Sequence, residues 1–172
     1  INVEFVSANP TGPLHVGHGR GVIYGNIIAK FLEIQGHDVK KEYYVNDYGN
    51  QIRKLCLSIF SKIDAIYGEN EDDLYQGGYI KEIAVLLEKN NLELPNKTNR
   101  TSLDLDIPEN TREFIVKNMI NRIKSQLDSL NITFDNWFYE SSLFNKKNKY
   151  SPDKLIKKLN DSGNLCNDGT SA

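Results

Sequence analysis

The chain contains few cysteines and no long hydrophobic stretch. Its two cysteines, Cys56 and Cys166, lie far apart and outside any CxxC spacing, which argues against a disulfide framework or a structural zinc site. This scarcity favours a reducing, cytoplasmic location. Because the apolar stretches span only a few residues, no segment is predicted to cross a membrane. Cys56 falls among periodic apolar residues and is expected to be a small core residue.

The sequence also lacks a surplus of positive charge and an initiator methionine. Its formal net charge is -2, whereas a protein that binds nucleic acid by itself usually carries a basic surface. The lysines within residues 146–149 and 154–158 are expected to lie on a solvated surface. The chain opens without a signal-like segment, within a predicted strand, and ends in a turn-like sequence at residues 167–172. We therefore expect it to be part of a longer protein.

The first 45 residues predict a strand, a helix and a second strand. Residues 3–8 are mostly apolar and end in a Pro/Gly turn, and residues 39–45 form a similar β-prone run. Between them, apolar residues recur near helical spacing from about residue 17 to 35, and Gly36 stands where a C-cap belongs. The order favours a βαβ unit with a parallel pair of strands. The apolar residues at this spacing are Ile23, Ile27, Phe31 and Ile34.

The remaining sequence alternates predicted helices with polar segments. Helices are expected at about 47–66, 79–88 and 108–130, a strand at 132–139, and a last helix from Ser151-Pro152 to Gly163. The acidic segment 69–73 and the polar segment 90–108 are expected to be loops or insertions. The apolar faces of the three helices are predicted as Ile52, Leu55, Cys56, Ile59, Ile63; Ile80, Ile83, Ala84, Leu87; and Ile115, Met119, Ile123, Leu127, Leu130.

Residues 7–19, SANPTGPLHVGHG, join the first predicted strand to the first helix. Ligands of parallel sheets bind at the carboxyl ends of strands, and a helix N-terminus favours phosphate. His15 and His18, three residues apart in the first turn, are expected on one side of the helix. The positive helix end favours neutral imidazoles, whose N–H groups can donate to phosphate or ribose oxygens. Gly17 leaves room for a nucleobase near the backbone, and Gly12 permits the tight turn.

An HxxH pair has two other interpretations. One histidine can simply cap the helix, or the pair can form half of a metal site. No carboxylate or cysteine stands nearby in the sequence to complete such a site, so no metal site is predicted. Two histidines that flank a glycine directly after a strand and a Pro/Gly turn favour nucleotide chemistry instead.

The segment His15-Val16-Gly17-His18 resembles the HIGH signature of class I aminoacyl-tRNA synthetases. The flanking sequence is similar to one branch, the arginyl-tRNA synthetases, over residues 3–18, 42–52, 75–80 and 134–143, in that family's order. The resemblance covers nearly the whole chain. It implies an α/β fold with a Rossmann-like parallel sheet of the HIGH type. It also implies that residues 1–172 form a single partial catalytic domain, the first half, with a helical or loop insertion at about 60–110.

The resemblance assigns roles to individual residues. His15 and His18 would be catalytic in adenylate formation, and Glu140 would face the guanidinium, which favours a carboxylate partner. An exposed strand-end glutamate is the alternative interpretation of Glu140. Asn46 and Asp47, at the end of the second predicted strand, would shape the ATP side of the site, unless Asp47 merely caps the next helix. The implied ATP-binding residues are Thr11, Gly12, His15, Gly17 and His18, and the implied arginine-binding residues are Ser7, Ala8, Asn9, His18 and Glu140.

The activity implied by the resemblance has two steps. Arginine and ATP, accompanied by Mg²⁺, form arginyl-adenylate, and the arginyl group passes to tRNA(Arg). The resemblance also implies a monomeric, cytoplasmic parent with no membrane contact. A lysine loop of the KMSKS type is absent from the sequence. The chain alone is therefore expected to be inactive and to bind ATP and arginine weakly at best.

Two alternatives to this function stay open. One is another HIGH-type nucleotidyltransferase, and the other is a non-catalytic, synthetase-like binding module. An intact lysine loop elsewhere in the protein would favour the enzyme, because its positive charge stabilises the departing pyrophosphate.

Overall fold

A computed structural model of the chain describes residues 1–64, 74–95, 106–144 and 151–164. The predicted loop at 69–73, residues 96–105 of the polar segment 90–108, the lysines at 146–149, Cys166 and the final turn at 167–172 lie outside these residues. The elements follow the order β1 (Asn2–Glu4), α1 (Val16–Ile34), β2 (Lys40–Val45), α2 (Asn50–Phe60), α3 (Gly78–Lys89), α4 (Glu109–Asp128), β3 (Asn136–Tyr139), the 3₁₀ helix η3 (Glu140–Phe144) and α5 (Pro152–Asp161).

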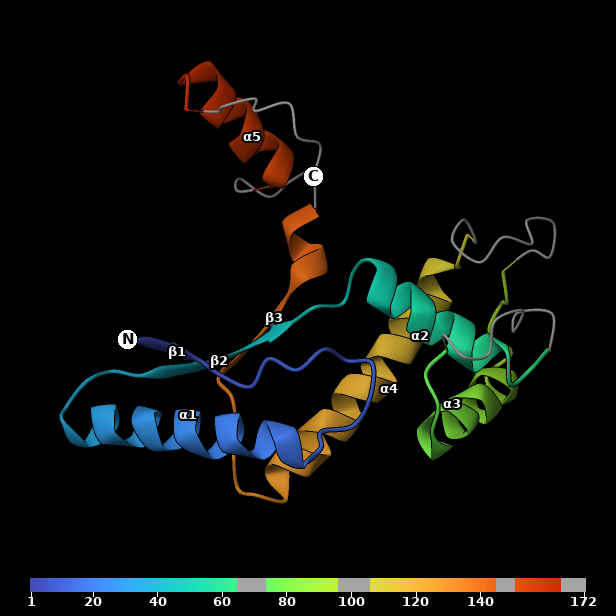
Figure 1. The fold of residues 1–172 in the computed structure, drawn as a ribbon, viewed down its shortest axis with the longest axis horizontal. Helices are drawn as coiled ribbons and strands as arrows, with labels where there is room; N and C mark the ends of the chain where they lie inside the picture. Colours follow the sequence, from blue (N-terminus) through green and yellow to red (C-terminus); the bar gives the residue numbers. More distant parts are fainter. Residues whose placement is uncertain (65–73, 96–105, 145–150, 165–172) are drawn as a thin grey trace.

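The three strands form one parallel sheet in the order β1-β2-β3. Asn2 pairs with Lys40 at one end of the register, and Val45 pairs with Tyr139 at the other. The helix α1 makes the connection from β1 to β2, and α2, α3 and α4 all lie in the connection from β2 to β3. Figure 1 shows α1 alongside the sheet, the other three helices grouped together, and α5 standing apart. The predicted βαβ unit and parallel sheet are confirmed.

The first strand is shorter than residues 3–8, because the backbone leaves the extended conformation directly after it. Val6 and Ser7 have φ angles of 65° and 41°, which no strand residue adopts. The Ser7 amide donates to the Phe5 carbonyl at 2.9 Å and closes a tight turn around Val6. The apolar character of residues 5–8 reflects burial of Phe5 and Ala8 beneath this turn rather than a longer strand.

The helix predicted at about 17–35 is confirmed as α1, but the apolar residues that recur along it are not its buried ones. Its buried residues are Val22, Gly25, Asn26 and Ala29, whereas Ile23, Ile27, Phe31 and Ile34 are all exposed. The reason is the close approach of the helix to Phe5. A Cβ at Gly25 would lie 2.3 Å from the Phe5 ring, so the helix packs through its smallest side chains and its large apolar residues face outward.

The helices α2, α3 and α4 pack on one another and contribute most of the core. The predicted apolar residues that lie within these helices are all buried. Ile63, after the end of α2, is partly buried, and Leu130, after the end of α4, is exposed. Cys56 is fully buried on α2, and burial raises the pKa of its thiol to about 12. It is therefore a core residue, as predicted, and not a nucleophile.

The later elements begin and end close to the predicted positions. The strand expected at 132–139 is confined to β3, and α5 begins at Pro152 after an N-cap at Ser151. Gly36 and Gly163, the predicted C-terminal glycines, have φ angles of 89° and 71°. Lys154, Lys157 and Lys158 are exposed on α5, as expected. Among the described residues, no helix is both long and apolar enough to span a membrane.

Candidate functional site

The side chains of His15 and His18 both accept hydrogen bonds from the backbone at the start of α1. His15 is the N-cap residue and its Nδ1 accepts from the Gly17 amide at 3.1 Å. The His15 amide in turn donates to Nδ1 of His18 at 3.2 Å, and the two ring centroids lie 3.9 Å apart. A Cβ at Gly17 would lie 2.9 Å from the His15 ring, so glycine is needed here for the ring to fold back on the helix. The predicted placement of both histidines on one side is confirmed.

The hydrogen bonds at this helix end define the tautomers of both imidazoles. Each Nδ1 accepts from a backbone N–H and therefore carries a lone pair. In the neutral ring the proton is then on Nε2, which is left as a donor. Partial burial, and secondarily the neighbouring His15, lower the pKa of His18 below its usual value. His18 therefore favours the neutral donor form that contact with a phosphate or ribose oxygen requires.

The segment between β1 and α1 is held by side chains from four other elements. Tyr43 of β2 donates to the Ala8 carbonyl at 2.9 Å, and Tyr79 of α3 donates to the Thr11 carbonyl at 2.9 Å. Gln126 of α4 makes two hydrogen bonds to the backbone of Leu14, directly before His15. Further contacts join Asn9 to Gln51 at 2.6 Å and place Gly12 beside the Tyr79 hydroxyl.

A second group of polar residues lies at the carboxyl ends of β2 and β3. In the amide orientation that its neighbours favour, Asn46 donates to Glu140 Oε2 at 2.8 Å. Asp47 accepts from the Ser141 amide at 2.8 Å and from the Ser141 hydroxyl at 2.6 Å. The alternative that Asp47 caps the next helix is wrong, because Gly49 is the N-cap of α2 and Asp47 instead holds the first turn of η3.

Negative charge gathers around Tyr44 in this second group. Burial raises the pKa of Tyr44, and so do the neighbouring carboxylates of Glu140, Asp47 and Glu4. Ser7 lies in the same place, since its hydroxyl donates to Glu4 at 2.6 Å and accepts from the Tyr44 amide at 3.0 Å. A site with this charge favours a cationic ligand, whereas the start of α1 favours an anionic one.

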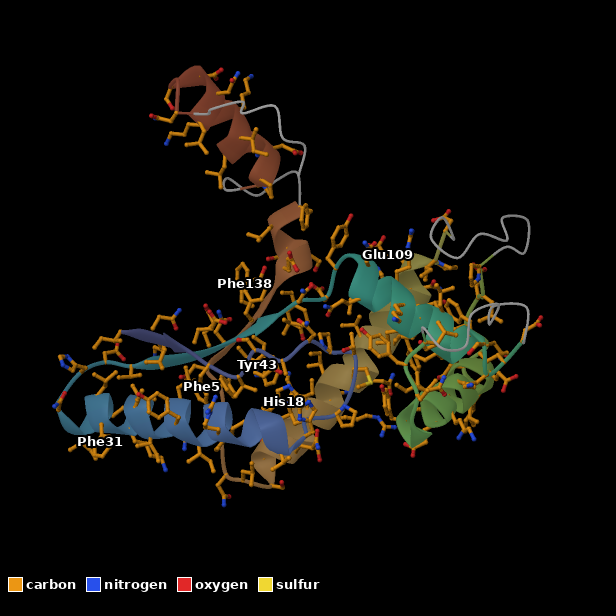
Figure 2. The ribbon with its side chains drawn as sticks, in the orientation of Figure 1. Phe5, His18, Phe31, Tyr43, Glu109 and Phe138 are labelled. Carbon is orange, nitrogen blue, oxygen red and sulfur yellow. The ribbon has the colours of Figure 1, made fainter. Side chains whose placement is uncertain are left out.

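The structure thus brings the predicted site residues together in two clusters. Around Tyr44 it assembles Ser7, Asn46, Asp47 and Glu140, and at the start of α1 it assembles His15, Gly17 and His18. The loop residues that connect the two clusters are Ala8, Asn9, Thr11 and Gly12. Figure 2 shows His18 at the start of α1.

Several residues that build these clusters were not predicted from the sequence. Tyr43, Tyr44, Tyr79 and Ser141 lie within segments that resemble the synthetase family, but no pattern assigned them a role. Gln126 carries no sequence signal, because it reaches Leu14 across 112 residues of chain. Only the tertiary structure identifies such a contact.

The sequence and the fold are similar to those of known proteins. A family model described as tRNA synthetases class I (R), catalytic domain, matches residues 1–168. An arginine–tRNA ligase of Magnetococcus marinus is 40% identical over 146 residues, which is 83% of this chain and 25% of that protein. One of Pelagibacter ubique is 41% identical over 163 residues, which is 91% of this chain and 27% of that protein.

A solved structure gives the same result at the level of the fold. The crystal structure of a putative arginyl-tRNA synthetase from Campylobacter jejuni superposes with a TM-score of 0.71 and 32% sequence identity. The match covers 93% of this chain and 34% of that chain. Measured against the two arginine–tRNA ligases above, the chain spans about a quarter of their length.

Proposed function

The chain belongs to the family of class I arginyl-tRNA synthetase catalytic domains, and we propose that it supplies the ATP site and the arginine site of an arginine–tRNA ligase. In this activity the carboxylate of arginine attacks the α-phosphate of ATP, which gives arginyl-adenylate and pyrophosphate. The arginyl group is then transferred to the terminal ribose of tRNA(Arg). Catalysis in such a reaction depends on positioning and on charge stabilisation.

One observation carries the ATP side of this proposal. The paired rings of His15 and His18 both use Nδ1 to accept from the backbone, so both have Nε2–H available at the positive end of α1. ATP phosphates would lie at this helix end, where the positive end of the helix dipole and the two imidazole donors both favour negative charge. The same donors would bind more strongly as charge develops on the phosphate in the transition state. Thr11, Gly12 and Gly17 would line this part of the site.

The arginine side of the proposal rests on the carboxylates around Tyr44. Glu140 would receive the guanidinium, and Asn46 would hold the carboxylate in place through its 2.8 Å contact. Ser7, Ala8 and Asn9 would lie at the α-amino and carboxylate end, between Glu140 and His18. The negative charge that Tyr44 experiences from Glu140, Asp47 and Glu4 supports a cationic substrate over a neutral one. Asp47 would act indirectly, because both of its oxygens already bond Ser141.

Other properties of the proposed enzyme follow from the family rather than from the contacts described above. Mg²⁺ would enter with ATP, bound mainly by the phosphates, because magnesium is commonly held by substrate phosphates. We also propose a monomeric, cytoplasmic enzyme. The lysine loop that would neutralise pyrophosphate is not within this sequence, so the chain alone is not expected to form the adenylate.

A chimeric enzyme tests the proposal directly. In the Magnetococcus relative, the matching segment would be replaced by residues 1–168 of this chain, and charging of bulk tRNA would be measured with each amino acid in turn. Charging with arginine alone, lost in His15→Ala and His18→Ala versions, supports the proposal. Charging with another amino acid would reject the arginine site. A folded chimera that charges nothing would favour a non-catalytic binding module.

Binding by the isolated chain gives a second, independent test. Mg–ATP should shift the imidazole NMR signals of His15 and His18, and L-arginine should shift the amides of Tyr44 and Ser141. L-Citrulline serves as a neutral control of nearly the same shape, and it should have little effect. Both affinities should be weak, so tight arginine binding measured by calorimetry would contradict the prediction for the isolated chain.

A further inference from the structure

Gln126 connects the end of α4 to the residue that precedes His15. Its Oε1 accepts from the Leu14 amide at 2.7 Å, and its Nε2 donates to the Leu14 carbonyl at 3.0 Å. One side-chain amide thus bonds both the N–H and the C=O of Leu14, as a backbone residue of a neighbouring strand would. Both Leu14 and Gln126 are half-buried, so these bonds are partly shielded from competing water.

The second of these bonds leads directly to His18. The Leu14 carbonyl and the His15 amide belong to the same peptide group, and that amide donates to Nδ1 of His18 at 3.2 Å. Hydrogen bonds in a chain polarise one another, so a donor at the carbonyl oxygen makes the N–H of the same peptide a stronger donor. This series of hydrogen bonds, from Gln126 through one peptide group to His18, fixes Nδ1 as the acceptor nitrogen of the His18 imidazole.

We propose that Gln126 is a positioning residue for the His15–His18 pair, holding the Leu14–His15 peptide so that Nδ1 of His18 stays an acceptor and Nε2 carries the proton. The significance of this for catalysis rests on the proposed function, because a donor at Nε2 is useful only if a phosphate or ribose oxygen binds there. The geometric part does not depend on ATP.

Other contacts of the same segment do not provide this link. Tyr79 bonds the Thr11 carbonyl and Tyr43 bonds the Ala8 carbonyl, several residues before the histidines. The two imidazoles accept hydrogen bonds from the backbone amides of residues 15 and 17. Gln126 therefore connects α4 to the backbone of Leu14, the residue directly before the histidine pair.

Imidazole NMR spectra of the labelled 172-residue chain test the proposal. In the unmodified chain, His18 should be the Nε2–H tautomer, with a scalar coupling across the hydrogen bond from the His15 amide to Nδ1 and another from Gln126 Nε2 to the Leu14 carbonyl. Gln126→Met, which removes both bonds, should give a tautomer mixture at His18 and an upfield shift of the His15 amide proton. Gln126→Glu should do the same, because it keeps an acceptor for the Leu14 amide but loses the donor to its carbonyl.

Two variants serve as controls. Gln35→Met makes the same chemical change at an exposed position after α1, and Tyr79→Phe loosens the same loop at Thr11. Neither should change the His18 tautomer. Absence of the two couplings in the unmodified chain overturns the proposal, and so does an unchanged His18 tautomer in folded Gln126→Met or Gln126→Glu.

An ATP titration separates this inference from the proposed function. Gln126→Met should weaken binding of Mg–ATP at least threefold. If the tautomer depends on Gln126 but ATP shifts neither histidine even in the unmodified chain, the proposed ATP site fails while the positioning role stands. If ATP shifts the histidines equally in the unmodified chain and in Gln126→Met, the ATP site stands and the positioning role fails.

Discussion

The His15 amide donates to Nδ1 of His18 at 3.2 Å, while the two imidazole rings lie 3.9 Å apart between centroids. His15 also caps the helix through its own Nδ1. The same residues therefore cap the N-terminus of α1 and present the donors proposed to bind ATP. Because the cap uses only Nδ1, the two roles fall on different nitrogens and can be separated by substitution.

His15→Ala should lower the free energy of unfolding by about 1 kcal/mol, because it removes the N-cap acceptor. His15→Asn should retain most of that stability, since asparagine is a good N-cap, but it lacks the Nε2–H donor. Urea unfolding followed by Trp137 fluorescence measures the stability, and the ATP-induced shift of His18 measures the site. If His15→Asn retained the full response to ATP, His15 would be a cap and nothing more.

The stability of the chain should fall below neutral pH because of His18. Its pKa is lowered in the folded state by burial and by His15, whereas the unfolded chain has the usual value of about 6.5. As the pH falls through that value, the unfolded state binds a proton that the folded state resists, so stability decreases. In His18→Gln this part of the pH dependence should disappear. Urea unfolding at pH 7.5 and at pH 5 checks this, and identical pH dependence in both proteins would contradict it.

Glu140→Gln should weaken arginine binding by roughly tenfold or more, because a charge-assisted bond to the guanidinium contributes about 1.5–3 kcal/mol. Binding of Mg–ATP should change little, since the histidine pair has no contact with this carboxylate among the described hydrogen bonds. NMR titrations with each ligand measure both effects. Glu113→Gln, at an exposed position of α4, is the matched control. An equal loss of both ligands would indicate damage to the fold instead of a specific site.

The helices and their order could be predicted from the sequence because apolar periodicity reports local burial. The predicted apolar residues within α2 and α3 are buried. The helix α3 buries one stripe, whereas α2 also buries Leu57, Ser58 and Phe60, so that residues 55–60 are all buried. In α1 the same periodicity indicates a helix but does not identify its buried face, because the large apolar residues are exposed. Contact with Phe5 selects the face with Gly25 and Ala29 instead, and side-chain size alone does not show which face approaches another element most closely.

The sequence predicted the candidate site only where the residues that form it lie close together along the chain. The spacing of His15 and His18 placed them together, whereas the tight turn at Val6 and the contact of Gln126 with Leu14 have no local pattern. The sequence allows two interpretations of Asp47, and the capping one is wrong because Ser141, distant in sequence, provides its partners. Contacts between distant segments depend on the packing of the whole fold, which periodicity does not encode.

Two glycines of α1 give a matched pair of stability tests. Gly25→Ala should destabilise the chain by about 1–3 kcal/mol, because its Cβ would lie 2.3 Å from the Phe5 ring in a packed interface. Gly21→Ala should stabilise it by about 0.5–1 kcal/mol, since no atom lies within 4 Å and alanine has the higher helix propensity. Thermal unfolding by circular dichroism distinguishes the two. Equal effects at both positions would mean that α1 does not approach Phe5 in solution.

The exposed apolar face of α1 should make the isolated chain associate with itself. Phe31 is 62% exposed and Ile27 and Ile34 lie on the same face, whereas Phe60 of α2 is 0% exposed. Phe31→Glu should change the free energy of unfolding by no more than about 0.5 kcal/mol, as expected for a surface position. It should also lower the weight-average mass in sedimentation, because exposed apolar patches promote association. Phe60→Glu should unfold the chain by placing an unpaired charge in the core. A large destabilisation by Phe31→Glu would show instead that another part of the chain covers this face of α1.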